Sequence, residues 1–390
     1  MVYREEDDFR NFRCIAGACP ESCCEGWQIV IDEDSLKRYQ GDKTPFGKRL
    51  AGSIDWQEGT FKQQDRRCLM LNDRNLCDLV IAEGEGSLCR TCHLFPRHME
   101  EYEDVREYTL DLSCPEAAKS IVERTTSFSM TEREDQTEDD PSEYEDFDFL
   151  LYDRLCAARD IFMTILDRKD LTLRQKSDRI LDLAARLDQC YQDDRIFDMD
   201  GELDREAGRD KAPCKGKVPD KGKEEGINQT SDKDREEAET LCASCGTFDE
   251  AKQTFKVLYQ LEKLHPDWDR VLDQTQKDVF SDRKVWQSVM CPDDDLPALN
   301  ILRSLLYTYF CGAVYDGEIF ARAAFCVQSL RWALMIGYSF QKEEADADPR
   351  KALTRALYQY CREVEHSDNN LDTLFNFFDK QEEGWEVSGD

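Results

Sequence analysis

Apolar residues recur at helical spacing through most of the second half of the chain. In residues 149–166 they fall three or four positions apart, which predicts an amphipathic helix. Strand signals are few: 27–31, and more weakly 79–81. The pattern predicts a mostly α protein, a helical domain with a small irregular cysteine-rich metal-binding head. The further helices that this spacing predicts are 173–191, 248–264, 297–314, 320–340, 350–364 and 371–378.

Shifts in composition divide the chain into five segments. Residues 131–148 hold ten acidic residues and one arginine, which is typical of a solvated connector. Residues 198–247 contain no aromatic residue and are dense in charge and glycine, so we expect a disordered insertion. The expected organisation is a cysteine-rich head at 1–125, an acidic connector at 126–148, a helical domain at 149–197 and 248–390, and the polar insertion at 198–247 between its two parts.

Charge narrows the possible partners. The 84 acidic residues outnumber the 52 basic ones, giving a net charge of −32, which disfavours nucleic acid and anionic membranes. The same charge is compatible with a basic or lysine-presenting protein partner, or with solubility alone. The acidic N-terminus does not resemble a signal peptide, and segment 320–340 contains Arg322, Gln328 and Arg331. We therefore expect a cytoplasmic protein without membrane insertion.

Eighteen cysteines are the chemically informative feature of the composition. Nine of them lie between Cys14 and Cys114, in short motifs such as Cys19-x3-Cys23-Cys24 and Cys89-x-x-Cys92. In a reducing compartment such clusters indicate metal ligands rather than disulfides. Spacing alone leaves zinc and an iron–sulfur cluster open. Five later cysteines stand in helical patterns and are expected to be core thiols: Cys156, Cys190, Cys311, Cys326 and Cys361.

Several blocks of the first 120 residues, taken in order, resemble the flagellin lysine-N-methylase (FliB-type) family. The resemblance covers about residues 10–122, and the polar insertion after Asp198 departs from it. The matching blocks are Phe12-Arg-Cys14, Cys19-x3-Cys23-Cys24-x-Gly26-Trp27, Ile31-Asp32, Cys68-Leu-x-Leu, Leu76-Cys77, Leu88-x-x-Thr91-Cys92-x-x-Phe95-Pro96-Arg97 and Leu110-x-Leu112-Ser113-Cys114-Pro115-Glu116-Ala117.

The resemblance implies an enzyme that transfers a methyl group from S-adenosylmethionine to surface lysines of flagellin. It also implies a 4Fe-4S cluster held by cysteines of the head. Cys23 and Cys92 lie at the centres of matching blocks, and one of the adjacent pair Cys23-Cys24 is expected not to be a ligand, because neighbouring side chains diverge. The predicted ligand set comprises Cys14, Cys19, Cys23, Cys24, Cys77 and Cys92.

Three other features admit two interpretations each. Arg97 is a candidate for binding the carboxylate of the methyl donor, or else pairs with the acidic segment 100–104 or with nearby backbone. His93 is a possible zinc ligand or an exposed loop residue. The segment from Leu79 to Gly86 superficially resembles a nucleotide-binding glycine turn, but no long helix follows, which favours a tight turn between cysteines.

The sequence singles out no catalytic residue. Methyl transfer to lysine needs a neutral amine, whose ordinary pKa is about 10.4, so a proton acceptor must lie close by. Among 84 acidic residues no candidate stands out. Two other function classes remain open at this stage: a zinc-stapled acidic helical adaptor, and an iron–sulfur redox protein without methyltransferase activity.

Overall fold

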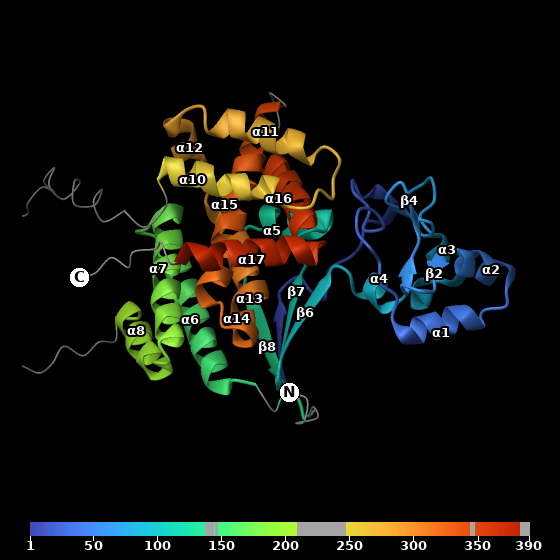
Figure 1. Ribbon diagram of the computed structural model, residues 1–390, viewed down its shortest axis with the longest axis horizontal. Helices are drawn as coiled ribbons and strands as arrows, with labels where there is room; N and C mark the ends of the chain where they lie inside the picture. The colour runs from blue at the N-terminus through green and yellow to red at the C-terminus, as the bar shows by residue number, and fades with distance from the viewer. Residues whose placement is uncertain (137–143, 145–146, 209–246, 344–347, 383–390) are drawn as a thin grey trace, which may run out of the picture.

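A computed structural model describes residues 1–136, 144, 147–208, 247–343 and 348–382, and the fold is mostly α-helical, as predicted. Figure 1 shows a large body of helices and one sheet, with a small head attached at one side. The head comprises residues 13–96. Residues 209–246 of the predicted insertion lie outside the described residues. The first part of that segment forms the helix α8 (Met199–Glu206), which buries Met199 and Leu203.

Helix α15 (Ile319–Glu343) runs through the middle of the body. It is long and apolar enough to cross a membrane, but 78% of its most apolar window is buried, as in the core helix of a globular protein. Large side chains such as Phe325 and Trp332 fill the space between it and its neighbours. The helices packed around it are α7 (Leu173–Gln192), α11 (Trp268–Val279), α12 (Arg283–Met290), α13 (Leu296–Tyr309), α16 (Pro349–Glu365) and α17 (Asp368–Glu382).

Most of the predicted helices are confirmed. The predicted helix 149–166 is α6 (Phe149–Asp167), and five others match α7, α13, α15, α16 and α17. The prediction for 248–264 is only partly right: α10 (Phe248–Thr254) passes into a 3₁₀ turn and then stops. The predicted 297–314 helix likewise breaks after Tyr309, before the short α14 (Ala313–Asp316). Helices α11 and α12 were not predicted.

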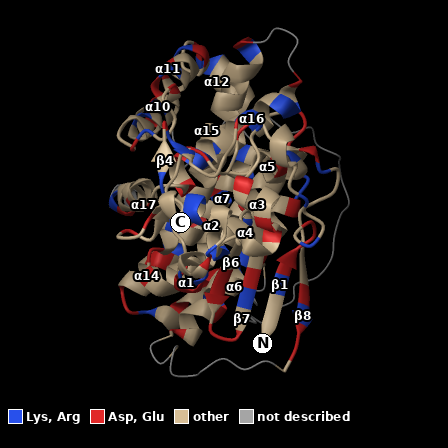
Figure 2. Ribbon diagram, turned by 90° about the vertical axis from the view of Figure 1, so that its right-hand side faces the viewer, with Lys and Arg blue, Asp and Glu red and all other residues tan. Residues whose placement is uncertain are grey.

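A four-stranded sheet, absent from the sequence prediction, covers one side of the helices. Its strands run in the order β6-β7-β1-β8, with β1 parallel to β7 and the other pairs antiparallel. Lys, Arg, Asp and Glu alternate along these strands (Figure 2), which hides the apolar period expected of a strand. Arg4 pairs with Glu132 and Arg133 with Glu5, both across neighbouring strands. The strands are β1 (Val2–Glu6), β6 (Arg97–Tyr102), β7 (Val105–Leu110) and β8 (Met130–Glu134).

A cluster of buried ionised side chains connects the sheet to the helices. Glu107 of β7 is 1% exposed and accepts two hydrogen bonds from the guanidinium of Arg159 on α6, itself 2% exposed. Arg4 of β1 donates a third, at 3.0 Å. The sheet and α5 (Pro115–Glu123) share one core with the helices, so packing assigns residues 97–123 to the body rather than to the head.

The head has a small core of its own, built from Ile29, Tyr39, Leu50, Ile54 and other apolar residues. The two predicted strands there are wrong. Residues 27–31 are irregular apart from one bridge, and 79–81 lie in a helix that ends at a glycine with positive φ. The elements of the head are α1 (Glu33–Gly41), α2 (Pro45–Gly52), α3 (Asp78–Glu83), α4 (Arg90–Leu94), β2 (Ile54–Asp55), β3 (Thr60–Phe61), β4 (Gln63–Gln64) and β5 (Arg67–Cys68).

Replacing Arg159 by leucine tests the buried ion cluster. The variant leaves Glu107 in the protein interior with Arg4 alone, and removal of one partner from a buried pair costs about 3–5 kcal/mol. Urea unfolding should show a loss of that size. Arg168→Leu is the control, because Arg168 ends the same helix in an exposed pair with Asp170 and should change stability by less than about 1 kcal/mol. Equal effects of the two substitutions would contradict this role of Glu107.

Candidate functional site

Three cysteines of the head and its junction with the body occupy helix N-termini. Cys77 precedes α3, Cys89 precedes α4 and Cys114 precedes α5, each at the N-cap position. None of the three sulfurs forms a cap hydrogen bond, but the nearby backbone N–H groups of the following turn act to lower the pKa of each thiol, which favours the thiolate, the form that binds metals. Burial acts in the opposite direction and raises the pKa of Cys114 to about 12.

The nine cysteines between residues 14 and 114 lie in two adjoining groups. Cys23 and Cys24 link them: their thiols interact with each other, Cys23 also lies near Cys14 and Cys114, and Cys24 lies near the second group. The hydrogen bond from Cys23 lowers the pKa of Cys24 to about 7. The first group consists of Cys14, Cys19, Cys23 and Cys114, and the second of Cys24, Cys68, Cys77, Cys89 and Cys92.

The donor chemistry of these groups suits a soft metal, because thiolates are the preferred ligands of zinc and of iron–sulfur clusters. In the described part of the chain, however, no three Cys, His, Asp or Glu side chains converge closely enough to hold a metal ion. The nine cysteines are thus close enough for their thiols to influence one another, but they form no metal-binding group in the described residues. The identity of the ligands and of the metal stays a prediction.

The loop that carries the Cys19–Cys24 motif is attached to the body by one arginine of α16. Arg362 donates hydrogen bonds to the backbone oxygens of Glu21, Ser22 and Glu25, at 3.3, 2.9 and 2.7 Å. The next residue, Gly26, has φ +92°, a conformation that side chains other than hydrogen rarely adopt. The indole N–H of Trp27 then donates to the carbonyl of Cys23 at 2.7 Å. Four of the five residues of the matched Cys-Cys-x-Gly-Trp block, namely Cys23, Glu25, Gly26 and Trp27, thus fix this turn.

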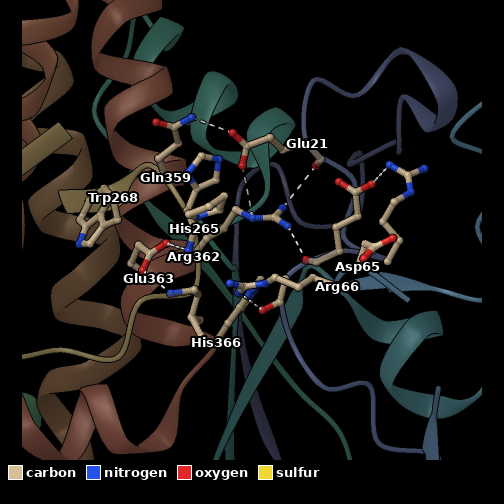
Figure 3. A pocket seen from close by; sticks show the side chains of 14 residues that line it. Glu21, Asp65, Arg66, His265, Trp268, Gln359, Arg362, Glu363 and His366 are labelled. Atoms are coloured by element: carbon tan, nitrogen blue, oxygen red, sulfur yellow. Dashed lines mark hydrogen bonds and ion pairs between the residues drawn. The ribbon is translucent and has the colours of Figure 1, made fainter. Parts of the chain in front are cut away.

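A cleft of about 290 Å³ lies between this loop and the body (Figure 3). The side chains of Arg362 and Glu21 line one wall of the cleft, and those of Arg66 and Asp65 from the head lie beside them. On the body side, the carboxylate of Glu363 accepts hydrogen bonds from the backbone of Leu264 and His265, and burial raises its pKa to about 7. The remaining lining residues are Glu25, Gly26, Arg67, Leu264, His265, Pro266, Trp268, Gln359 and His366.

A second, larger cleft of about 970 Å³ adjoins the first and shares Gly26, Leu264 and His366 with it. Its head side includes Trp27 and Phe61, and its body side is formed by the start of α17 and the segment around Glu262. Four carboxylates and one lysine line it, so a cationic segment would be attracted. These charged residues are Asp55, Glu58, Lys62, Glu262 and Asp368.

His366 lines both clefts. Its ring stacks on Trp27 with centroids 4.7 Å apart, and Phe95 lies 6.0 Å away. Its Nε2 lies 3.0 Å from the hydroxyl oxygen of Ser113. Burial lowers the pKa of His366 to about 4, so the ring is neutral at physiological pH. Sequence reasoning gave no role to His366 or Arg362, because neither stands in a recognisable motif.

Arg97 and His93 lie elsewhere. The guanidinium of Arg97 lies over the rings of Phe9 and Phe12 and donates a long hydrogen bond, 3.5 Å, to the carbonyl of Phe12. It does not line either cleft, so its role with a methyl donor stays a prediction. His93 is exposed, but it lies in helix α4 rather than in a loop. Four of the five expected core thiols are buried, and Cys156 is half-buried.

Comparison with known proteins agrees with the resemblance read from the sequence. The chain is 27% identical over 132 residues to a lysine-N-methylase of Salmonella typhimurium strain LT2, and 26% identical over 132 residues to one of Salmonella choleraesuis. It is also 26% identical to the flagellar biosynthetic protein FliU of Salmonella muenchen. These regions cover 32% of this chain, 33% of each lysine-N-methylase and 78% of FliU. The chain is therefore matched over about a third of the length of the lysine-N-methylases. No family model and no solved structure matches.

Removing the side chain of Arg362 should loosen the cysteine loop. In Arg362→Ala, three backbone carbonyls lose a charged donor, so amide hydrogen exchange over residues 19–26 should accelerate, and stability should fall by about 1–3 kcal/mol. Arg350→Ala is the control on the same helix, since Arg350 forms an exposed pair with Asp294. Unchanged exchange over residues 19–26 would show that the loop holds its shape without Arg362.

Proposed function

We propose that this protein transfers a methyl group from S-adenosylmethionine to the side-chain nitrogen of lysines on flagellin. The observation that carries the proposal is the similarity to proteins named lysine-N-methylase over 132 residues. The flagellar name of the third relative, FliU, supports a flagellar substrate. Because the matched region is a third of the chain, the proposal also draws on the geometry and charge of the clefts.

The clefts between head and body suit such a substrate. Lysine methylation requires a pocket that admits a long cationic side chain and excludes bulk water around the reacting atoms. The larger cleft, about 970 Å³, is large enough for a side chain together with part of a methyl donor. Its carboxylates and the net charge of −32 would steer a lysine-presenting surface towards it.

We also propose that the head carries a 4Fe-4S cluster. Its ligands would come from Cys14, Cys19, Cys23, Cys24, Cys77 and Cys92. These cysteines belong to both thiol groups, and the adjacent residues Cys23 and Cys24 connect the two groups. A bound cluster would add its binding energy to the folding of a head whose own apolar core is small. Reduced thiols of this kind persist in the cytoplasm, where we place the protein.

Methyl transfer to flagellin is the direct test of the enzyme. Purified protein, S-adenosylmethionine and unmodified flagellin should yield flagellin heavier by multiples of one methylene in intact-mass spectrometry, with the change located on lysines. Heat-inactivated protein and omission of the methyl donor are the controls. Binding of S-adenosylmethionine in calorimetry without any methylated lysine would favour a different acceptor. Absence of binding would favour an adaptor or a redox protein.

Cysteine variants test the cluster. Anaerobically purified protein should contain iron and acid-labile sulfide at about four each per chain. Cys23→Ser and Cys92→Ser replace a soft thiolate by a hydroxyl and should lose most of both. Cys326→Ser is the control: its sulfur is buried 3.3 Å from the carbonyl of Leu305, a bond that serine can keep, so iron should persist at a cost of about 1 kcal/mol in stability.

Two results would contradict the cluster assignment. Stoichiometric zinc without sulfide would replace the iron–sulfur proposal by a zinc site. Full iron in Cys92→Ser together with its loss in Cys326→Ser would move the site into the helical body.

A further inference from the structure

The smaller cleft contains an arginine of the head that forms no ion pair with any of the described residues. Arg66 is exposed, and its guanidinium donates hydrogen bonds to the backbone carbonyls of Gly26, at 3.0 Å, and Lys263, at 3.4 Å. The other two arginines of the cleft, Arg67 and Arg362, each pair with a glutamate. A guanidinium has five N–H donors, so Arg66 keeps donors for a ligand in the cleft.

A carboxylate of the body lines the same cleft. Glu363 is 1% exposed and accepts hydrogen bonds from the backbone N–H of Leu264, at 2.8 Å, and from that of His265. In the described part of the chain no lysine or arginine forms an ion pair with it. Burial raises the pKa of Glu363 to about 7, as expected of a carboxylate whose charge is incompletely compensated. A cationic group bound in the cleft would supply that compensation.

Arg66 and Glu363 contact the two sides of one peptide group (Figure 3). Arg66 binds its oxygen, the carbonyl of Lys263, and Glu363 binds its N–H, which belongs to Leu264. The guanidinium and the carboxylate are therefore separated by no more than a peptide group and two hydrogen bonds. An α-amino acid with an ion pair at each charged group covers a similar span, since its ammonium nitrogen and carboxyl carbon are two bonds apart, like the oxygen and nitrogen of a peptide.

We propose that the smaller cleft binds the amino-acid end of S-adenosylmethionine, with the carboxylate of the donor on Arg66 and its ammonium on Glu363. The inference rests on the proposed methyltransferase function and adds to it the place of the methyl donor. Arginine binds carboxylates through two parallel N–H groups. A cleft of about 290 Å³ suits a part of the donor rather than the whole. Arg66 thus takes the carboxylate contact for which the sequence suggested Arg97, a residue that lines neither cleft.

The residues shared by the two clefts orient the rest of the donor. Leu264, whose N–H binds Glu363, lines both clefts together with Gly26 and His366. A short alkyl chain separates the amino-acid end of the donor from its sulfonium, so the sulfonium reaches this shared region. There the indole of Trp27, stacked on His366, offers a face that attracts a cation. The methyl group and the adenosine then lie towards the larger cleft, where the lysine is proposed to enter.

Two ligands isolate this subsite in calorimetry with the full chain: S-adenosylhomocysteine, which has the amino-acid end, and 5′-methylthioadenosine, which lacks it. The wild-type protein should bind S-adenosylhomocysteine more tightly. Arg66→Met and Glu363→Gln each remove one charge at similar side-chain size. Each should weaken S-adenosylhomocysteine about tenfold or more, the effect of losing a hydrogen bond to a charged group, and leave methylthioadenosine unchanged. A purely structural role of either residue would weaken both ligands alike.

Decarboxylated S-adenosylmethionine, which keeps the ammonium and lacks the carboxylate, separates the two side chains. Its affinity should fall in Glu363→Gln and stay unchanged in Arg66→Met. Arg66→Lys should bind S-adenosylhomocysteine with intermediate affinity, because an ammonium cannot form the paired hydrogen bonds of a guanidinium. Arg49→Met is the control in the head, since Arg49 pairs with Asp78 and lines neither cleft. If Glu363→Gln does not fold, the exposed Arg66 still decides the question through its own two variants.

The outcomes separate this inference from the proposed function. If the ligands and variants follow the expected pattern but no lysine of flagellin is methylated, the proposed function fails and the donor subsite stands. If flagellin is methylated and Arg66→Met keeps the wild-type KM for S-adenosylmethionine, the methyltransferase stands and the donor is held elsewhere. The subsite is also overturned if the wild-type protein does not bind S-adenosylhomocysteine, binds both ligands equally, or loses both equally in the variants.

Discussion

The parallel pairing of β1 with β7 is the constraint from which the rest of the architecture follows. Val2 lies opposite Val105 and Glu5 opposite Tyr108, so the first strand of the chain is held beside a strand that comes after the whole head. Because β6 is antiparallel to β7, the chain leaves β1 and re-enters β6 at the same end of the sheet. Both ends of the head are therefore anchored at one end of the sheet, and the Glu107–Arg159 ion pair holds that sheet to the helices.

The candidate site gathers at this same end. The segment after β7 brings Ser113 within 3.0 Å of His366, at the end of helix α16. One helix end thus supplies the arginine that holds the cysteine loop and the imidazole shared by both clefts. Arg362 and the stacked rings of Trp27 and His366 thus join the cysteine loop to the body beside both clefts.

Sequence reasoning succeeded where one segment alone determines the structure. The helices α6, α7, α13, α15, α16 and α17 carry apolar stripes that predict them directly. The sheet was not predicted from the sequence, because strands such as β1 and β8 contain both acidic and basic residues. These residues pair across the sheet, so no apolar period remains along the strands. Arg362 and His366 were not predicted for another reason: neither stands in a recognisable motif, and the head residues that they contact lie far away in the chain.

We place the binding of the proposed substrates at the junction between head and body. Hydrogen-exchange mass spectrometry of the full chain, with and without S-adenosylmethionine and a lysine-bearing flagellin segment, tests it most directly. We expect slower exchange in the segments that line the clefts, residues 25–28, 58–69, 262–268 and 359–369. Protection confined to α6, α7 and α8, on the far side of the body from the head (Figure 1), would contradict it.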